Sequence, residues 1–328
     1  MPDSILSIQE LKTQFATRSG TAAAVDGIDF EMQAGRTLCL VGESGSGKSV
    51  TALSIPRLLD SNASTTGRIL FEGKDLLELR ERELRSLRGG KIAMIFQEPA
   101  TSLNPVQTIG QQITEAIRLH RPIARSEIKE EVHRLLAETR IADPVRCARQ
   151  YPHELSGGMK QRVMIAMALA GEPDLLLADE PTTALDVTVQ ADILRLLRRI
   201  QEERHIAILL ITHDLGVVAE IADDVAVMYA GQIVEHGLAT DILQRPEHPY
   251  TQGLLRSLPR IDRDSMPVPI EGVVPLPTAW PAGCRFRPRC PHAFEQCGND
   301  PQILTRNPHS KRAACWLTVT NAPSSEVT

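Results

Sequence analysis

Several features that would place a chain in a membrane or on nucleic acid are missing from this sequence. No apolar run approaches the ~18 residues that a membrane-spanning helix needs, and the longest runs, such as residues 206–212, have the length of a strand. The first ten residues lack the basic-then-apolar pattern of a secretory signal. The net charge of -5 argues against a protein that coats nucleic acid. These absences predict a chain that reaches a membrane only through a partner.

The sequence also lacks internal repeats, sustained heptads and cysteines over most of its length. Its 328 residues, 42% of them hydrophobic, suffice for one large α/β domain with a smaller appendage. Beyond about residue 240 prolines recur, and four of the six cysteines crowd the last 45 residues. We therefore predict one domain over residues 1–240 and a proline- and cysteine-rich extension over residues 241–328.

The pattern of apolar residues predicts alternating strands and helices. Residues 5–33 alternate apolar and polar positions, as short antiparallel strands do. Buried parallel strands are predicted at the apolar runs 37–41, 91–96, 175–178 and 207–211. Helices are predicted for residues 50–59, 115–140, 160–170 and 192–203. This order indicates an α/β fold.

A glycine-rich loop follows the first of these parallel strands. Residues 42–49 read Gly-Glu-Ser-Gly-Ser-Gly-Lys-Ser and lie between a strand and a helix, the context of a phosphate-binding loop. Its amides can wrap a phosphate, while the lysine reaches the β- and γ-phosphates and the last serine reaches Mg²⁺. The predicted nucleotide-binding residues of this loop are Gly42, Ser44, Gly45, Gly47, Lys48 and Ser49.

Two carboxylates stand at the end of a later apolar strand. Residues 175–178 are followed directly by Asp179 and Glu180. Downstream of a phosphate loop, such a pair predicts that Asp179 holds Mg²⁺ and that Glu180 polarises the attacking water.

A second anion-binding loop lies about 110 residues after the first. Ser156, Gly157 and Gly158 precede a predicted helix, so that exposed amides and a helix N-terminus can hold an anion. The two loops need not serve the same nucleotide. One interpretation is a head-to-tail dimer in which this loop closes on ATP held by the partner, and the other is an ordinary helix cap.

Together these motifs resemble the nucleotide-binding domain of ABC transporters over roughly residues 5–240. The resemblance implies a P-loop ABC-type fold with an antiparallel β subdomain and a helical subdomain, and it implies ATP and Mg²⁺. It also implies four roles: Phe15 stacks on adenine, Gln97 links metal and water to the coupling region, Asp186 contacts the opposite site, and His213 touches the γ-phosphate. Met159 departs from the family, whose commonest signature has glutamine there.

The extension resembles that of oligopeptide/dipeptide and nickel importer ATPases, on residues 245–251, 254–259 and 283–290. Some members of that family hold a [4Fe–4S] cluster in this region, which here would use Cys284, Cys290, Cys297 and Cys315. The spacing of these cysteines is looser than is usual for structural zinc and unlike the tight bacterial ferredoxin pattern. Four thiolates suit either iron–sulfur or zinc, and unligated cysteines in a proline-rich tail are the third alternative. Arg285, Arg287 and Arg289 are interpreted as a solvated or partner-facing surface.

The resemblance implies an ATP-hydrolysing subunit that energises the import of peptides or a related solute such as nickel. Its partners would be a second ATP-binding subunit, two membrane permease subunits and an extracytoplasmic substrate-binding protein, with no nucleic acid. It would lie at the cytoplasmic face of the cell membrane. A soluble ABC ATPase acting on DNA or the ribosome and a metal-sensing regulatory ATPase are the alternatives.

Overall fold

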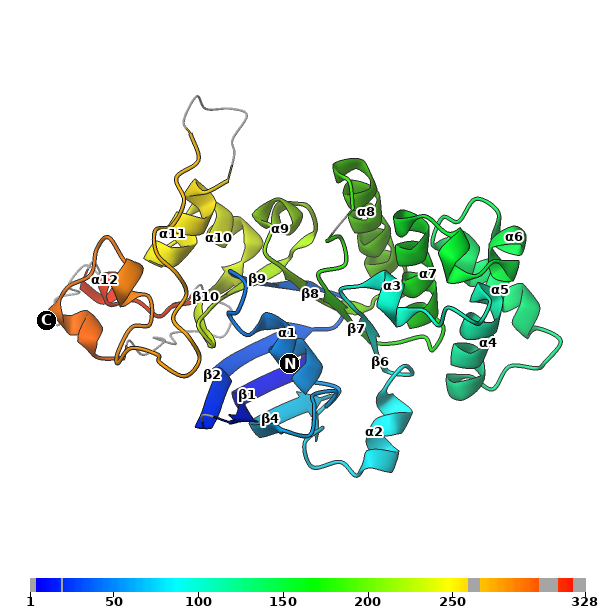
Figure 1. Ribbon diagram of the computed structural model, residues 1–328, viewed down its shortest axis with the longest axis horizontal. Coiled ribbons are helices and arrows are strands. Elements are labelled where there is room, and N and C mark those ends of the chain that lie inside the picture. Colours follow the sequence, from blue (N-terminus) through cyan, green and yellow to red (C-terminus); the bar gives the residue numbers. More distant parts are fainter. Residues whose placement is uncertain (1–3, 19, 184, 259–265, 301–311, 321–328) are drawn as a thin grey trace, which may run out of the picture. The chain divides into compact units, whose positions relative to one another are not determined.

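The computed structural model describes residues 4–18, 20–183, 185–258, 266–300 and 312–320 (Figure 1). The chain folds into two compact units, each assembled from separate stretches of sequence. The first unit comprises Met1–Leu6, Glu31–Thr37 and Leu70–Ile211. The second comprises Ser7–Phe30, Leu38–Ile69 and Thr212–Thr328.

The first unit contains three neighbouring parallel strands and a group of helices. Its elements are β5 (Lys74–Asp75), α2 (Glu81–Leu87), β6 (Ile92–Ile95), α3 (Pro99–Ser102), α4 (Ile109–His120), α5 (Ile128–Glu138), α6 (Pro144–Arg149), η1 (Pro152–Glu154), α7 (Gly157–Leu169), β7 (Leu175–Asp179), α8 (Val187–Arg204) and β8 (Ala207–Thr212).

The three parallel strands of the first unit, β6, β7 and β8, are almost entirely apolar, as suits strands that are buried on both faces. β7 lies between β6 and β8, with Ile92 opposite Leu175 and Leu175 opposite Ala207. Every residue of β7 and β8 is buried, as expected for parallel strands covered on both sides. The predicted strands at 91–96, 175–178 and 207–211 are confirmed, and β7 delivers its terminal carboxylate, Asp179, at its end.

The helices α4, α5, α6 and α7 pack against one another (Figure 1). α4 buries Ile109, Ile113 and Ile117, which lie one turn apart and so share a face. The helix-prone stretch predicted at residues 115–140, punctuated at Pro122, corresponds to two helices, α4 and α5. Pro122 stands two residues after the end of α4 and disfavours helical backbone in the residue before it.

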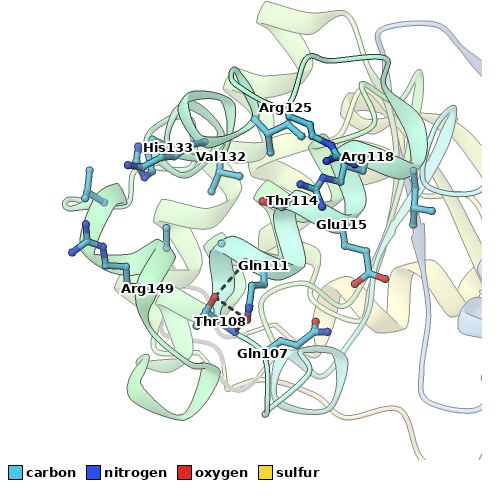
Figure 2. A pocket seen from close by; sticks show the side chains of 16 residues that line it. Gln107, Thr108, Gln111, Thr114, Glu115, Arg118, Arg125, Val132, His133 and Arg149 are labelled. Atoms are coloured by element: carbon cyan, nitrogen blue, oxygen red, sulfur yellow. Dashed lines mark hydrogen bonds between the residues drawn. The ribbon is translucent and has the colours of Figure 1, made fainter.

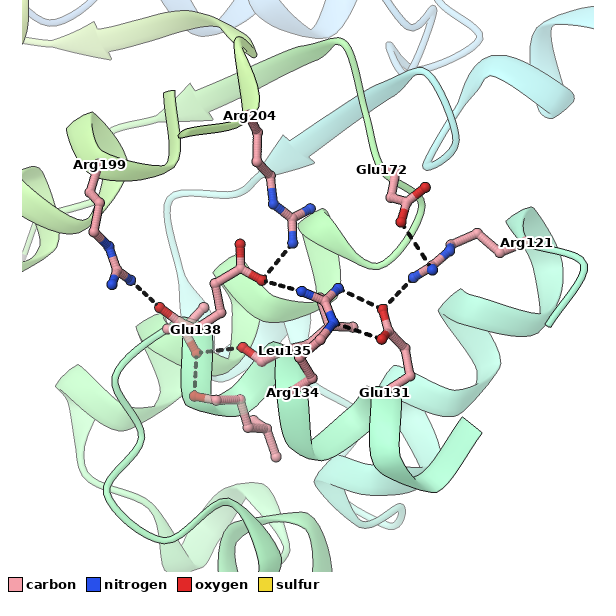
Figure 3. A network of polar contacts seen from close by, with 10 residues as sticks. Arg121, Glu131, Arg134, Leu135, Glu138, Glu172, Arg199 and Arg204 are labelled. Carbon is pink, nitrogen blue, oxygen red and sulfur yellow. Dashed lines mark hydrogen bonds and ion pairs between the residues drawn. The ribbon is translucent and has the colours of Figure 1, made fainter. Parts of the chain in front are cut away.

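A network of ion pairs joins these helices (Figure 3). Both oxygens of Glu131 accept hydrogen bonds from the guanidinium of Arg134, each at 2.7 Å, and Arg121 pairs with the same carboxylate. Glu138 is paired with Arg134 and with Arg204 of α8. The charges therefore hold α5 to the end of α4 and to α8.

The second unit contains most of the remaining strands and the C-terminal segment. Its elements are β1 (Ser4–Thr17), β2 (Gly20–Gln33), β3 (Thr37–Val41), α1 (Lys48–Ser54), β4 (Ala63–Phe71), α9 (Leu215–Ile221), β9 (Asp224–Tyr229), β10 (Gln232–Leu238), α10 (Ala239–Gln244), α11 (Pro249–Arg256), η2 (Arg287–Arg289), η3 (Glu295–Gly298), β11 (Arg312–Ala313) and α12 (Trp316–Thr320).

Two groups of strands organise the second unit. β2, β1 and β4 are neighbours in that order. β3 runs parallel to β9, and β10 pairs with β9 and with β11 in antiparallel fashion. Because Ala313 of β11 lies opposite Glu235 of β10, the C-terminal segment is an integral part of this unit.

Two other sequence predictions need correction. The strands in residues 5–33 are two 14-residue strands, β1 and β2, and not a series of short ones. The helix predicted for residues 50–59 begins earlier, at Lys48, and ends at Ser54. Among the residues that the structure describes, no helix is long and apolar enough to cross a membrane.

Candidate active site

The phosphate loop (residues 42–49) lies in the second unit between β3 and α1. Gly42 and Gly47 have φ angles of 155° and 104°, values that favour glycine. A Cβ atom on Gly42 would lie 2.1 Å from the carbonyl oxygen of Met228, and one on Gly47 would lie 2.4 Å from that of Ala24. Glycine is therefore required at both positions because neighbouring backbone approaches so closely.

Lys48 is buried and folds back over this loop. Its Nζ donates to the carbonyl oxygens of Gly42 at 2.8 Å and Glu43 at 2.9 Å, and to Oγ of Ser46 at 3.4 Å. Ser44 and Gly45 are exposed. The loop thus presents exposed backbone beside a positively charged amine, an arrangement that can bind phosphate.

Glu180 follows directly after β7 in the first unit and is held by two side chains. Gln97 Nε2 donates to Glu180 Oε2 at 3.0 Å, and Thr183 Oγ1 donates to the same oxygen at 2.8 Å. Glu180 has a φ of 45°, which is uncommon for a residue with a side chain and marks local strain. Asp179, the residue before Glu180, is buried. The structure therefore brings Gln97 and Glu180 together, and sequence reasoning missed Thr183.

The Ser156-Gly157-Gly158 loop begins α7 in the first unit. Oγ of Ser156 accepts a hydrogen bond from the backbone N–H of Met159 at 3.3 Å, so the serine is a helix cap as predicted. Oδ1 of Asp186 caps α8 in the same manner, accepting from Val189 N at 2.9 Å.

These two helix starts lie beside one another. A Cβ atom on Gly158 would lie 2.9 Å from the side chain of Val189. Ser156, Gly157 and Asp186 are all exposed. The first unit therefore presents this loop and Asp186 on neighbouring, accessible surface.

The other two predicted nucleotide contacts lie in the second unit. Phe15, on β1, is half-buried, so its ring is not part of the fully buried core. His213 follows β8 directly, and its side chain is exposed. The contacts of both residues with nucleotide stay predictions.

The four late cysteines gather around one small cavity of about 10 Å³ in the second unit. Burial raises the pKa of Cys315 to about 11 and also raises the pKa values of Cys284 and Cys290, which favours the protonated thiols. Among the described residues, no three His, Cys, Asp or Glu side chains are grouped so that they could hold one metal ion. The thiols as placed do not fit a metal site, and the predicted [4Fe–4S] cluster is not supported.

Two arginines beside these cysteines are buried, contrary to the sequence interpretation. Arg285 donates to the carbonyl oxygen of Ala230 at 2.6 Å and pairs with Asp26. Arg289 pairs with Glu43 of the phosphate loop. Only Arg287 of the three is exposed as predicted. These two ion pairs could not be predicted from neighbouring residues, because the partners are distant along the chain.

A groove of about 870 Å³ lies on the surface formed by α4, α5 and α6 in the first unit (Figure 2). We call it the helical groove. Leu119 at its edge is 71% exposed. Its lining is rich in positive charge, and among the described residues that line it Glu115 is the only carboxylate. The cations are Arg118, Arg125, Lys129 and Arg149.

Comparison with known proteins defines the class. The sequence model described as "ABC transporter" matches residues 25–183. The dimeric post-hydrolysis structure of the ATP-binding cassette MJ0796 with ADP and Pi is 26% identical, with a TM-score of 0.64, and the match covers 71% of this chain and 98% of that one. The cbiO1 structure from Clostridium perfringens is 31% identical, with a TM-score of 0.63, covering 74% and 92%. The fold is that of an ABC ATPase cassette, as predicted.

The relatives matched by sequence belong to a narrower class than ABC ATPases in general. The model described as "Oligopeptide/dipeptide transporter, C-terminal region" matches residues 234–297. The dipeptide transport ATP-binding protein DppD of Bacillus subtilis is 48% identical over 96% of this chain and 95% of its own length. The oligopeptide transport ATP-binding protein OppD of Salmonella typhimurium is 48% identical over 94% and 92%. The chain belongs to this family of peptide ABC transporter ATP-binding proteins.

Proposed function

We propose that this chain hydrolyses ATP to energise the import of dipeptides or longer peptides across the cytoplasmic membrane. The observation that carries the proposal is similarity to dipeptide and oligopeptide transport proteins over nearly the whole chain. This similarity includes the C-terminal region as well as the ATPase. The ATPase motifs alone would fit transporters of many solutes.

In this proposal the phosphate loop binds the nucleotide. Lys48 exchanges its carbonyl partners for oxygens of the β- and γ-phosphates. Ser49, Asp179 and Gln97 supply the hydroxyl, carboxylate and amide oxygens that Mg²⁺ prefers as ligands. When bound, Mg²⁺ neutralises charge that develops on the phosphates. Phe15 stacks on the adenine and His213 contacts the γ-phosphate.

Glu180 acts on the attacking water. The water oxygen forms a bond to the γ-phosphorus, its proton passes to the Glu180 carboxylate, and the bond to the bridging oxygen breaks to release ADP. The hydrogen bonds from Gln97 and Thr183 to Oε2 hold the carboxylate in one orientation. A fixed orientation reduces the entropy that must be lost to reach the transition state.

A second ATP-binding subunit completes the site. Ser156, Gly157 and Asp186 are exposed on neighbouring surface, so they are available to nucleotide held by a partner. The related cassette MJ0796 was solved as a dimer. We propose that these residues act in a head-to-tail dimer, with either a second copy or a related chain as the partner.

The helical groove is the proposed docking site for one permease subunit, and the second ATP-binding subunit would dock the other. Its cations and the exposed Leu119 fit a short amphipathic helix that carries acidic side chains. Docking there places the chain at the cytoplasmic face of the membrane, with an extracytoplasmic binding protein delivering the solute.

Uptake of a labelled dipeptide by cells tests the proposal. We expect Glu180→Gln to abolish uptake while ATP binding persists, because the substitution removes the proton acceptor and keeps the shape. Glu203→Gln, on an exposed carboxylate of α8, is the matched control and should leave uptake unchanged. Lost uptake of longer peptides alone would narrow the solute to those peptides, whereas unchanged uptake of all peptides with lost uptake of nickel would reassign it.

A further inference from the structure

The phosphate loop contains a negative charge of its own. Glu43 is its second residue, and the Glu43 side chain is 29% exposed. A carboxylate in a loop that binds phosphates repels them, and an unpaired one offers Lys48 a competing partner. Lys48 Nζ already donates to the Glu43 carbonyl oxygen at 2.9 Å. The charge of Glu43 therefore needs a partner other than Lys48 for the loop to bind an anion.

Arg289 of the C-terminal segment is that partner. Its NH1 donates to Glu43 Oε2 at 2.6 Å and its NH2 to Glu43 Oε1 at 3.0 Å, a bidentate pair. The arginine side chain is only 5% exposed, so water screens the pair weakly. Removing Arg289 would leave the Glu43 carboxylate without this countercharge in the loop that binds phosphate.

The guanidinium is fixed from its other side as well. Nε donates to the carbonyl oxygen of Glu271 at 2.8 Å, and NH2 donates to that of Ile270 at 3.2 Å. Its central carbon lies 5.8 Å from the ring centroid of Tyr229. Arg289 is thus held in one position before nucleotide arrives.

A second side chain of the extension, that of Tyr250, forms a hydrogen bond with the backbone of Glu43. The backbone N–H of Glu43 donates to the Tyr250 hydroxyl at 2.8 Å. Tyr250 is fully buried, with its ring 4.6 Å from that of Tyr229 and 5.4 Å from that of Phe286. Glu43 is therefore held at its N–H by Tyr250 and at its carboxylate by Arg289.

We propose that Arg289 is a positioning residue for ATP, which neutralises Glu43 and, with Tyr250, keeps Lys48 available for phosphate. The C-terminal extension is then part of the machinery for nucleotide affinity. This inference rests on the proposed role of residues 42–49 as the ATP phosphate loop.

The test is ATP affinity of the purified full-length chain, by calorimetry, together with KM and kcat for hydrolysis. We expect Arg289→Ala to raise Kd and KM for ATP by about tenfold or more with a change in kcat of less than about threefold. Glu43→Gln/Arg289→Ala should return both constants to within about threefold of the wild type, because no unpaired charge remains. Arg289→Lys should fall between, since it keeps the charge and loses the bidentate geometry.

Arg287→Ala is the matched control, an exposed arginine in the same short turn, and should leave both constants unchanged. Unchanged affinity in Arg289→Ala would overturn the inference, and so would a double variant as weak as the single one, which would indicate a structural role. If Arg289→Ala does not fold, wild-type affinity in Arg289→Lys at low and high salt would overturn it equally. Lys48→Ala separates the two proposals: if it binds ATP normally, the phosphate-loop assignment itself fails.

Discussion

Gln97 and Glu180 lie 83 positions apart in the sequence, yet the Gln97 amide donates a 3.0 Å hydrogen bond to Oε2 of the Glu180 carboxylate. Thr183 donates to the same oxygen from only three residues away. One oxygen of the proposed proton acceptor is thus held by a local partner and by a distant one. The distant partner can transmit a change in the segment around Gln97 to the carboxylate.

This arrangement predicts graded losses of ATP turnover. Replacing Glu180 with Gln should lower kcat by about 10² or more, the usual contribution of a general base. Thr183→Ala should lower kcat by about tenfold or less, because the carboxylate remains but loses one restraint. Gln97→Ala should lower kcat further, though less than Glu180→Gln does, because it also removes a proposed Mg²⁺ ligand. Steady-state hydrolysis with Glu203→Gln as control checks the order. A Gln97→Ala variant slower than Glu180→Gln would contradict it.

The phosphate loop offers a test of close packing at two glycines that both have positive φ. Gly45 and Gly47 both have positive φ, 77° and 104°, but a Cβ on Gly45 meets nothing within 4 Å while one on Gly47 meets the Ala24 carbonyl oxygen at 2.4 Å. Both alanine variants carry the backbone strain of about 1–2 kcal/mol. We expect Gly47→Ala alone to lower Tm by several degrees more, measured by thermal unfolding. Equal Tm values would show that the loop moves away from Ala24 at little cost.

The ion-pair network predicts a pH dependence of stability. Hydrogen bonds from Arg134 and then Arg121 lower the pKa of Glu131 to about 2, below the unfolded value of about 4.3. A depressed carboxylate pKa stabilises the fold above the unfolded pKa, and this stabilisation is lost as the pH falls from about 4.3 towards 2. Glu131→Gln should therefore be less stable than the wild type at pH 7, with the difference shrinking towards pH 2.5. Denaturant unfolding at both pH values checks this, with exposed Glu130→Gln as control.

If the helical groove docks the permease, a substitution in it should abolish transport without changing ATP hydrolysis. Leu119→Glu should leave ATP hydrolysis by the isolated chain unchanged and should abolish peptide uptake, because a charge opposes docking of an apolar helix face. Leu276→Glu is the control, since Leu276 is 69% exposed against 71% for Leu119 but lies in the C-terminal segment. Normal uptake by Leu119→Glu, with the permease still co-purifying, would place the docking site elsewhere.

Local chemistry made much of the site predictable from the sequence. The phosphate loop is contiguous, and its glycines, Lys48 and Ser49 act through neighbouring backbone. Asp179 and Glu180 follow an apolar strand, so their place at its end was predictable. The cap at Ser156 was predictable for the same reason, because a serine before two glycines satisfies nearby amides.

Pairings across long sequence separations were not predictable in this way. Arg289 and Glu43 are 246 positions apart, and the arginine lies among prolines and cysteines where a solvated surface was the better interpretation. Conversely, four cysteines suggested a cluster, but their placement does not form a metal site among the described residues. Spacing shows which thiols are available, whereas ligand geometry depends on packing.

The sequence by itself determined the class of protein, because the nucleotide motifs are short stretches whose chemistry depends on adjacent residues. Only the tertiary structure decided what the C-terminal extension does to the phosphate loop. Tyr250 and Arg289 reach Glu43 because β9, β10 and the extension pack into one unit. Burial then turns an arginine that could have been solvated into a fixed countercharge, and burial is a property of the folded chain.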